Sequence, residues 1–101
     1  MKDDKKLNEI KEQIEPVLKK YPISYAGIFG SFARGEERSE SDVDIMIRLK
    51  PNNTFSLFDL IGVESELANK IGRKVDLATE RSIGRYIKNS VFHDLKPIYE
   101  A

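Results

Sequence analysis

The sequence contains no cysteine and only one histidine, and these absences narrow the chemistry open to the protein. Without cysteine there are no disulfides, no thiolate metal sites and no cysteine nucleophiles. The single histidine, His93, stands beside Asp94 near the end of the chain. Because no serine or cysteine motif accompanies it, we interpret His93 as a surface residue rather than a member of a hydrolase triad.

Net charge and long apolar runs are also missing. Seventeen basic residues balance seventeen acidic ones, so no overall field would hold the protein on nucleic acid or on an anionic membrane. The lysines near the start alternate with acids, which indicates a solvated helix face rather than a nucleic-acid patch. The opening "MKDDKKLNEIKEQ" lacks the apolar core of a signal peptide, and no apolar run approaches about 18 residues. We therefore expect a cytoplasmic protein that binds no membrane, and direct binding to nucleic acid is not expected.

The length and the apolar pattern predict one domain over residues 1–101. A chain of 101 residues buries only about 60–68% of its unfolded surface, so it has room for one modest core. Apolar residues at three- and four-residue steps predict an amphipathic helix over residues 3–20, which Pro16 should bend or divide. The core region is expected to follow, over about residues 23–99.

Within this core, short apolar or alternating runs predict strands at residues 23–29, 42–49 and 74–79, with an edge strand at 97–100 that begins at its proline. In the run "DVDIMIRL" one face should pack and the other should not, because apolar residues alternate there with Asp42, Asp44, Met46 and Arg48.

Helices should connect these strands. We expect a helical turn at residues 31–34 ended by Gly35, a solvated loop over 36–41, and a last helix around 83–91 weakened by Gly84. The break at Pro51 predicts a further helix capped by Asn53 or Thr54 and stopped by Gly72. Its expected apolar stripe comprises Leu57, Phe58, Ile61, Leu67, Ala68 and Ile71. The aromatic residues expected in the core, rather than as base-stacking platforms, are Phe55, Phe58, Tyr86 and Tyr99.

Three aspartates carry the first chemical signal. Asp42 and Asp44 are two residues apart on a predicted strand, so their side chains point the same way, with Cα atoms about 6.6 Å apart. Alone, such a pair could be a solvated polar face. Asp76, which lies between two apolar residues on a strand that could pair beside the first, would add a third carboxylate. Because three clustered carboxylates are costly without a cation, and Mg²⁺ takes oxygen ligands while keeping open positions for phosphates, the cluster suggests a metal site that holds a nucleotide.

The second signal is Gly30-Ser31, which follows the first strand of the core. A glycine lets the backbone approach a ligand closely, and Ser31 offers a hydroxyl and free amide groups to an anion at the start of a helical turn. The pair could equally be a tight turn with an ordinary helix cap. Arg34 could reach a phosphate from the next turn, or it could pair with Glu36 or Glu37 in water.

The sequence resembles the DNA polymerase β-like nucleotidyltransferase superfamily in three features taken together. These are the motif "GSFARG", the ten residues between Gly30-Ser31 and Asp42-x-Asp44, and the later Asp76. Within this superfamily, "GSFARG" followed by "SDVDIMI" is similar to the minimal MNT proteins, the antitoxin partners of HEPN-domain toxins. The resemblance covers roughly residues 23–99. It implies an α+β fold, in which helices flank a small mixed β-sheet.

The resemblance also implies roles and partners. Asp42, Asp44 and Asp76 would bind two Mg²⁺ ions, Gly30-Ser31 would hold the triphosphate of ATP, and Asp76 would be a candidate general base. Larger relatives carry an additional domain for the acceptor. This chain has none, so a partner should provide the acceptor, a tyrosine hydroxyl of a HEPN toxin encoded nearby, which would receive AMP. Two alternatives remain: a non-catalytic module that neutralises a toxin by covering it, and nucleotidyl transfer to a small molecule or an RNA end.

Overall fold

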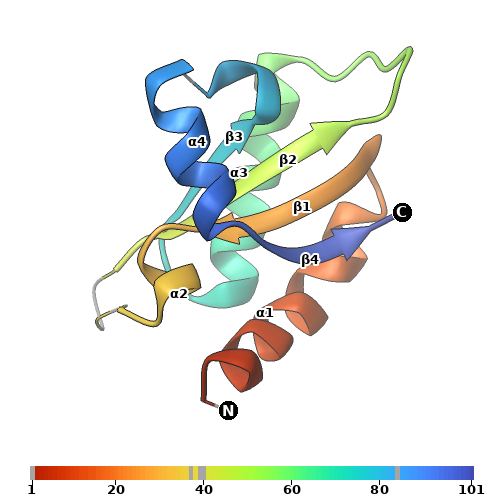
Figure 1. Ribbon diagram of the computed structural model, residues 1–101. Helices are drawn as coiled ribbons and strands as arrows, with labels where there is room; N and C mark the ends of the chain where they lie inside the picture. Colours follow the sequence, from red (N-terminus) through yellow and green to blue (C-terminus); the bar gives the residue numbers. More distant parts are fainter. Residues whose placement is uncertain (1, 37, 39–40, 84) are drawn as a thin grey trace.

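The protein is built around one four-stranded sheet. The computed structural model describes residues 2–36, 38, 41–83 and 85–101, and Figure 1 shows their arrangement. The strands are β1 (Ile23–Phe29), β2 (Val43–Leu49), β3 (Val75–Thr79) and β4 (Lys96–Glu100). In the sheet order β3-β2-β1-β4, β1 pairs antiparallel with both β2 and β4, while β2 and β3 are parallel. The expected α+β fold with a mixed sheet is therefore confirmed.

The helices occupy the connections between strands and the start of the chain. They are α1 (Lys2–Leu18), α2 (Ser31–Arg34), α3 (Leu57–Ile71), the 3₁₀ turn η1 (Glu80–Ser82) and α4 (Arg85–Asp94). Helix α1 was expected to bend or divide at Pro16, but it continues to Leu18 without a division. Pro16 removes only its own backbone donor, and only two residues of the helix follow it, so little of α1 depends on the chain beyond the proline.

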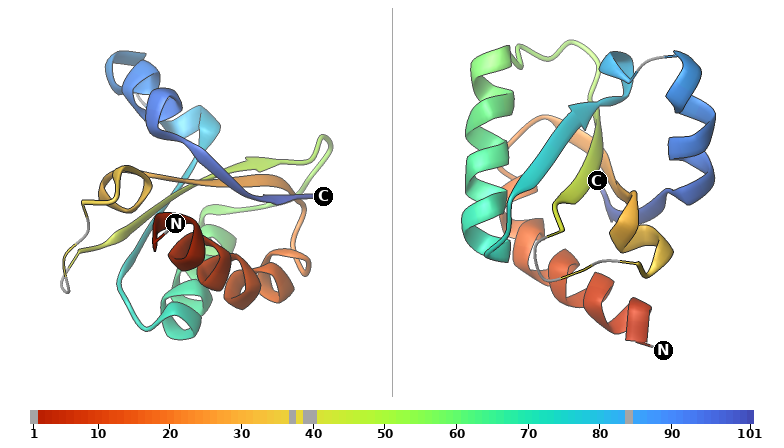
Figure 2. Two further views of the ribbon diagram at one scale, coloured as in Figure 1. Left: turned by 60° about the horizontal axis from the view of Figure 1, so that its bottom comes forward. Right: turned by 90° about the vertical axis from the view of Figure 1, so that its left-hand side faces the viewer.

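Both faces of the sheet are covered, one of them more fully than the other. Helices α1 and α3 lie on one face and α4 lies on the opposite face (Figure 2). The larger core lies on the first face and contains fully buried residues such as Ile14, Ile28 and Leu67. On the second face Met46 is buried with Val91 of α4. The expectation that this side of β2 would remain unpacked is therefore wrong at Met46, because α4 supplies an apolar cover.

The packed face of α3 differs in part from the expected stripe. Val63 and Leu67 are fully buried, whereas Leu57, Phe58 and Ile61 are 69%, 85% and 56% exposed. Apolar residues lie on two sides of this helix's first half, so periodicity alone could not say which side meets the sheet. The contact with α1 and β3 selects the side that carries Val63.

The start of α3 is fixed by a residue that the sequence analysis passed over. Ser56 is the N-cap, where its Oγ accepts a hydrogen bond from Asp59 N–H at 3.1 Å. Asp59 Oδ2 in turn accepts from Ser56 N–H at 2.8 Å, which completes a capping box. Asn53 instead bonds its own loop, because its Oδ1 accepts from Phe55 N–H. The expected caps, Asn53 and Thr54, are therefore wrong by two or three residues.

Several other expectations can be compared with the structure. Gly72 ends α3 in the left-handed conformation, as predicted. Strand β4 lies at the sheet edge but begins at Lys96, one residue before its proline. Tyr99 is buried and Phe55 is half-buried against Tyr21, while Phe58 is wrongly assigned to the core. Gly84, the Tyr86 side chain and residues 37, 39 and 40 of the predicted loop lie outside the described parts of the structure.

No helix in the described ranges has the length and apolar character needed to cross a membrane. This finding agrees with the absence of long apolar runs in the sequence.

The Ser56 capping box makes a testable contribution to stability. Ser56→Ala should lower the free energy of unfolding by about 1 kcal/mol, because an amide at the start of α3 loses its acceptor. Thr54→Ala, two residues earlier and also exposed, should change it by less than about 0.5 kcal/mol. Urea denaturation followed by circular dichroism measures both. A loss at Thr54 as large as that at Ser56 would contradict this assignment of the cap.

Candidate active site

The parallel pairing of β2 with β3 brings two of the predicted site residues together. Asp44 and Asp76 are direct partners in the register of these strands. Neighbouring strands are about 4.8 Å apart, and partnered residues point to the same face. That face is the one that carries α4, since the alternate residues Val43 and Ile45 lie in the core on the other side. The expected pairing of the two acid-bearing strands is therefore present.

Asp42 joins this face from the residue before β2. It lies two residues ahead of Asp44, and its carboxylate Oδ2 is 4.0 Å from the Lys74 ammonium. The segment that leads to it is held by Arg73, whose Nη1 donates to the carbonyl oxygens of Arg38 at 2.8 Å and Ser41 at 3.2 Å. The sequence analysis did not identify this support, because nothing in the local pattern around Arg73 indicates a contact more than 30 residues away.

Gly30 passes directly beside the Asp44 carboxylate. Phe29, the last residue of β1, pairs with Asp44, and the chain then turns at Gly30 with φ 76° and ψ −150°. This combination is almost restricted to glycine. A Cβ at Gly30 would also collide with Asp44 Oδ2. The turn therefore requires glycine on two independent grounds, and it places the Gly30 backbone beside the acids.

Ser31 opens the short helix α2 immediately after this turn. The helix runs from Ser31 to Arg34, and Gly35 ends it in the left-handed conformation with φ 71°, as predicted. Buried Phe32 and Ala33 anchor α2 in the core, which leaves Ser31 and Arg34 at least partly accessible. The Gly30-Ser31 bend and the acids are thus adjacent in space.

The carboxylate of Asp44 has more negative than positive charge around it. Burial raises the pKa of Asp44 above its ordinary value, and the negative charges of Asp76 and Asp42 raise it further. The positive charge of Arg34 acts in the opposite direction and lowers the same pKa. Asp44 is therefore close enough to both other acids and to Arg34 for their charges to interact. A cation beside Asp44 would favour its ionised form.

The fit of these residues to a metal ion follows from their chemistry. Among the described residues, no three acidic or histidine side chains converge closely enough, as they stand, to enclose an ion. However, Asp42 and Asp44 are half-exposed and Asp76 is exposed, so an ion can reach all three carboxylates from solvent. Three carboxylates on one face are an all-oxygen donor set, which suits Mg²⁺. The donor set fits Mg²⁺, although its side chains are not already arranged around an ion.

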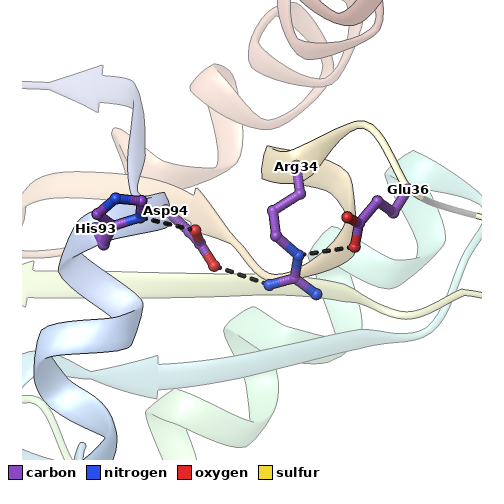
Figure 3. A network of polar contacts seen from close by, with 4 residues as sticks. All are labelled: Arg34, Glu36, His93 and Asp94. Atoms are coloured by element: carbon purple, nitrogen blue, oxygen red, sulfur yellow. Dashed lines mark hydrogen bonds and ion pairs between the residues drawn. The ribbon is translucent and has the colours of Figure 1, made fainter.

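Arg34 links α2 to the end of α4. Its Nε–H donates to Glu36 at 2.9 Å and its Nη1 donates to Asp94 at 2.8 Å, while His93 Nδ1 lies 3.4 Å from the other Asp94 oxygen (Figure 3). Pairing with Glu36, one of the alternatives left open for Arg34 by the sequence, is thus present. The contact with Asp94 was missed, because the two residues are 60 positions apart and no sequence pattern relates them.

A groove of about 560 Å³ lies at the other ends of β2 and β3. It is lined by Lys50, Phe55 and Arg81, among others, and by none of the predicted site residues. The acids instead lie where β2 and β3 begin. Because the acids, Gly30 and Ser31 form the chemically consistent set, we take the open face at Asp44 as the candidate active site.

Comparisons with known proteins give a consistent answer. Residues 12–101 match the family model described as polymerase beta, nucleotidyltransferase. A protein of Methanocaldococcus jannaschii, provisionally named a protein adenylyltransferase, is 38% identical over 88 residues, which are 87% of this chain and 92% of that protein. The protein adenylyltransferase MntA of Thermococcus cleftensis is 30% identical over 92 residues, which are 83% of this chain and 91% of MntA.

Solved structures share the fold. A crystal structure of a toxin-antitoxin with AMP-PNP matches with a TM-score of 0.77 at 22% identity, over 90% of this chain and 73% of that chain. The structure of a tri-AMPylated HEPN toxin of Shewanella oneidensis in complex with its MNT antitoxin matches with a TM-score of 0.69 at 19% identity, over 91% of this chain and 71% of that chain. At these identities the likeness establishes the fold.

The close approach of Gly30 to Asp44 can be tested with a second glycine as control. Gly30→Ala should lower the free energy of unfolding by about 3 kcal/mol, because both the backbone and the Asp44 carboxylate must adjust. Gly72→Ala has a similar φ of 78° but open space around its Cβ position, so it should cost only about 1–2 kcal/mol. Urea denaturation measures both variants, and equal losses would show that Asp44 does not crowd Gly30.

The raised pKa of Asp44 predicts how stability depends on pH. Between its unfolded and folded pKa values the folded protein binds more protons than the unfolded chain, so stability falls as pH rises through this interval. Without nucleotide or Mg²⁺, Asp44→Asn should therefore increase the free energy of unfolding at pH 7. The gain should vanish as pH falls below the ordinary aspartate range.

Urea denaturation at several pH values tests this expectation. Glu9→Gln, which changes an exposed acid on α1, serves as the control and should leave stability nearly unchanged. A less stable Asp44→Asn protein at pH 7 would contradict the predicted sign.

Proposed function

Because this chain belongs to the polymerase β nucleotidyltransferase family, we propose that it is a cytoplasmic, Mg²⁺-dependent protein adenylyltransferase that acts as an antitoxin. It transfers AMP from ATP to a hydroxyl group of a partner protein and releases pyrophosphate. The observation that carries the proposal is the pairing of Asp44 with Asp76, which gathers the acids beside the Gly30-Ser31 turn. This arrangement supports nucleotide chemistry at one end of the sheet.

The relatives support protein as the acceptor class. MntA of Thermococcus cleftensis is named a protein adenylyltransferase, and it aligns with most of this chain. The HEPN toxin of Shewanella oneidensis carries three AMP groups in its complex with an MNT antitoxin of the same fold. We therefore propose a HEPN toxin as the partner of this chain and a tyrosine hydroxyl of that toxin as the acceptor.

The three aspartates are the proposed ligands of two Mg²⁺ ions. When bound, these ions would neutralise charge on the triphosphate and on the pyrophosphate that leaves. The repulsion that raises the pKa of Asp44 is then compensated, so nucleotide and metal should bind together.

The other residues of the chain hold the substrates. The Gly30 backbone lies beside the Asp44 carboxylate, so a triphosphate held at the acids would also be within reach of this turn, and the Ser31 hydroxyl can donate to a phosphate oxygen. The acceptor oxygen attacks the α-phosphorus, and the bond from this phosphorus to the pyrophosphate oxygen breaks. Asp76, exposed on the edge strand β3, accepts the proton of the attacking hydroxyl as general base.

Labelled ATP tests the proposed reaction directly. The protein is incubated with Mg²⁺, α-labelled ATP and the HEPN protein encoded beside it, and label on the toxin is measured. The wild type should label the toxin, and Asp44→Asn should be slower by about 100-fold or more, because one charged group at the reacting phosphate is lost. Glu9→Gln, an exposed change on α1, should retain the wild-type rate. Absence of label with the wild-type protein would refute adenylylation of the toxin.

The two alternatives predict different results in the same system. A non-catalytic antitoxin would still protect cells from the toxin after Asp42→Asn and Asp44→Asn are combined, whereas the proposed enzyme would not. Transfer to a small molecule or an RNA end would leave the toxin unlabelled and label that acceptor instead. Mass spectrometry of all products separates these outcomes.

A further inference from the structure

The contact between Arg34 and Asp94 joins the proposed nucleotide-binding turn to a helix that carries none of the motif residues. Arg34 is the last residue of α2, and Asp94 is the last residue of α4. Their side chains meet at 2.8 Å, and Figure 3 shows the guanidinium between Asp94 and Glu36. This contact crosses from one connection of the sheet to another.

The ion pair between Arg34 and Asp94 contributes little to the stability of the fold. The Arg34 side chain is 46% exposed, and partly exposed ion pairs contribute little to folding because water screens them. A carboxylate in the last turn of a helix is, in addition, opposed by the negative end of the helix dipole. The presence of Asp94 at this position is therefore better explained by its effect on the position of the Arg34 side chain.

Asp94 is well placed to hold another side chain. Its neighbour Leu95 packs against the second core with Met46 and Val91, and a Cβ on Gly27 would collide with Leu95. The Asp94 side chain is only 18% exposed, compared with 63% for Glu36, the other partner of Arg34. Of the two carboxylates, Asp94 is thus the one that the fold holds in place.

The held guanidinium lies close to the candidate active site. Arg34 ends α2, the single helical turn that starts after Gly30 beside the Asp44 carboxylate, so the guanidinium and the acids share one end of the sheet. The contacts with Glu36 and Asp94 use the Nε–H and one Nη1–H, and a guanidinium has three further N–H donors. These donors suit phosphate oxygens, which arginine binds with a defined geometry.

We propose that Asp94 is a positioning residue, which holds the Arg34 guanidinium ready to bind the phosphates of the incoming nucleotide. The inference rests on the proposed function, since it requires a nucleoside triphosphate at the Asp44 site. An arginine side chain loses much rotational freedom when it binds, and a side chain already held loses less. Through this contact α4 contributes to nucleotide affinity without touching the ligand.

Calorimetric titration of the full chain with AMP-PNP and Mg²⁺ tests the inference, because it requires neither partner nor turnover. Asp94→Ala should weaken binding about three- to tenfold, the effect of releasing one long side chain. Asp94→Asn, which retains an oxygen acceptor for Nη1–H, should lose less. Glu9→Gln, an exposed change on α1 across the sheet from α4, is the control and should bind like the wild type.

A double-mutant cycle separates positioning from a structural role. If Asp94 acts through Arg34, Asp94→Ala should add almost nothing to the loss caused by Arg34→Ala. Three results would each overturn the inference. The losses could be fully additive, or Asp94→Ala could bind the nucleotide as tightly as the wild type. Asp94→Ala could also bind more tightly, which is expected if Asp94 competes with phosphate for Arg34. Thermal melts verify that the variants are folded. If the wild-type chain fails to bind the nucleotide, the proposed function fails as well. If the wild type binds and Asp94→Ala has the same affinity, only the positioning role of Asp94 is refuted.

Discussion

The register between the parallel strands β2 and β3 is the constraint on which the site depends. It places Asp44 directly beside Asp76, so two like charges share one patch of the sheet. Because like charges repel, the Asp76 carboxylate raises the pKa of Asp44, and this repulsion opposes the register. Burial of each fully enclosed aliphatic side chain contributes roughly 1.5–3 kcal/mol. Because Val43, Ile45 and Leu67 are among those buried on the opposite face, the core can hold the acids together.

Helix α3 connects these two strands and helps to hold their register. Its buried residues Val63 and Leu67 lie in the main core, which α3 shares with β3. Glu64 of the same helix accepts a hydrogen bond from Leu77 N–H at 2.9 Å, so an amide of the edge strand is satisfied by a side chain. An edge strand with its amides occupied is less available to foreign strands. The helix therefore supports the β3 strand that carries Asp76.

Helix α4 covers part of the sheet face that carries the acids. It covers Met46 with Val91, two residues along β2 from Asp44, and ends at Asp94 beside Arg34. The middle of the face is thus apolar and closed, while the end with the acids stays accessible. Gly30, the acids and Arg34 meet at this accessible end.

The sequence by itself determined the strands and the Gly30 turn, because alternation and turn chemistry are local properties, and its resemblance to a known family gave the α+β class. It also predicted that Asp42, Asp44 and Asp76 act as one set. Only the tertiary structure decided that Val63 rather than Phe58 faces the core and that Asp94 holds Arg34. Both outcomes depend on which surfaces meet across the sheet. Such contacts join residues far apart in the chain, and no local periodicity records them.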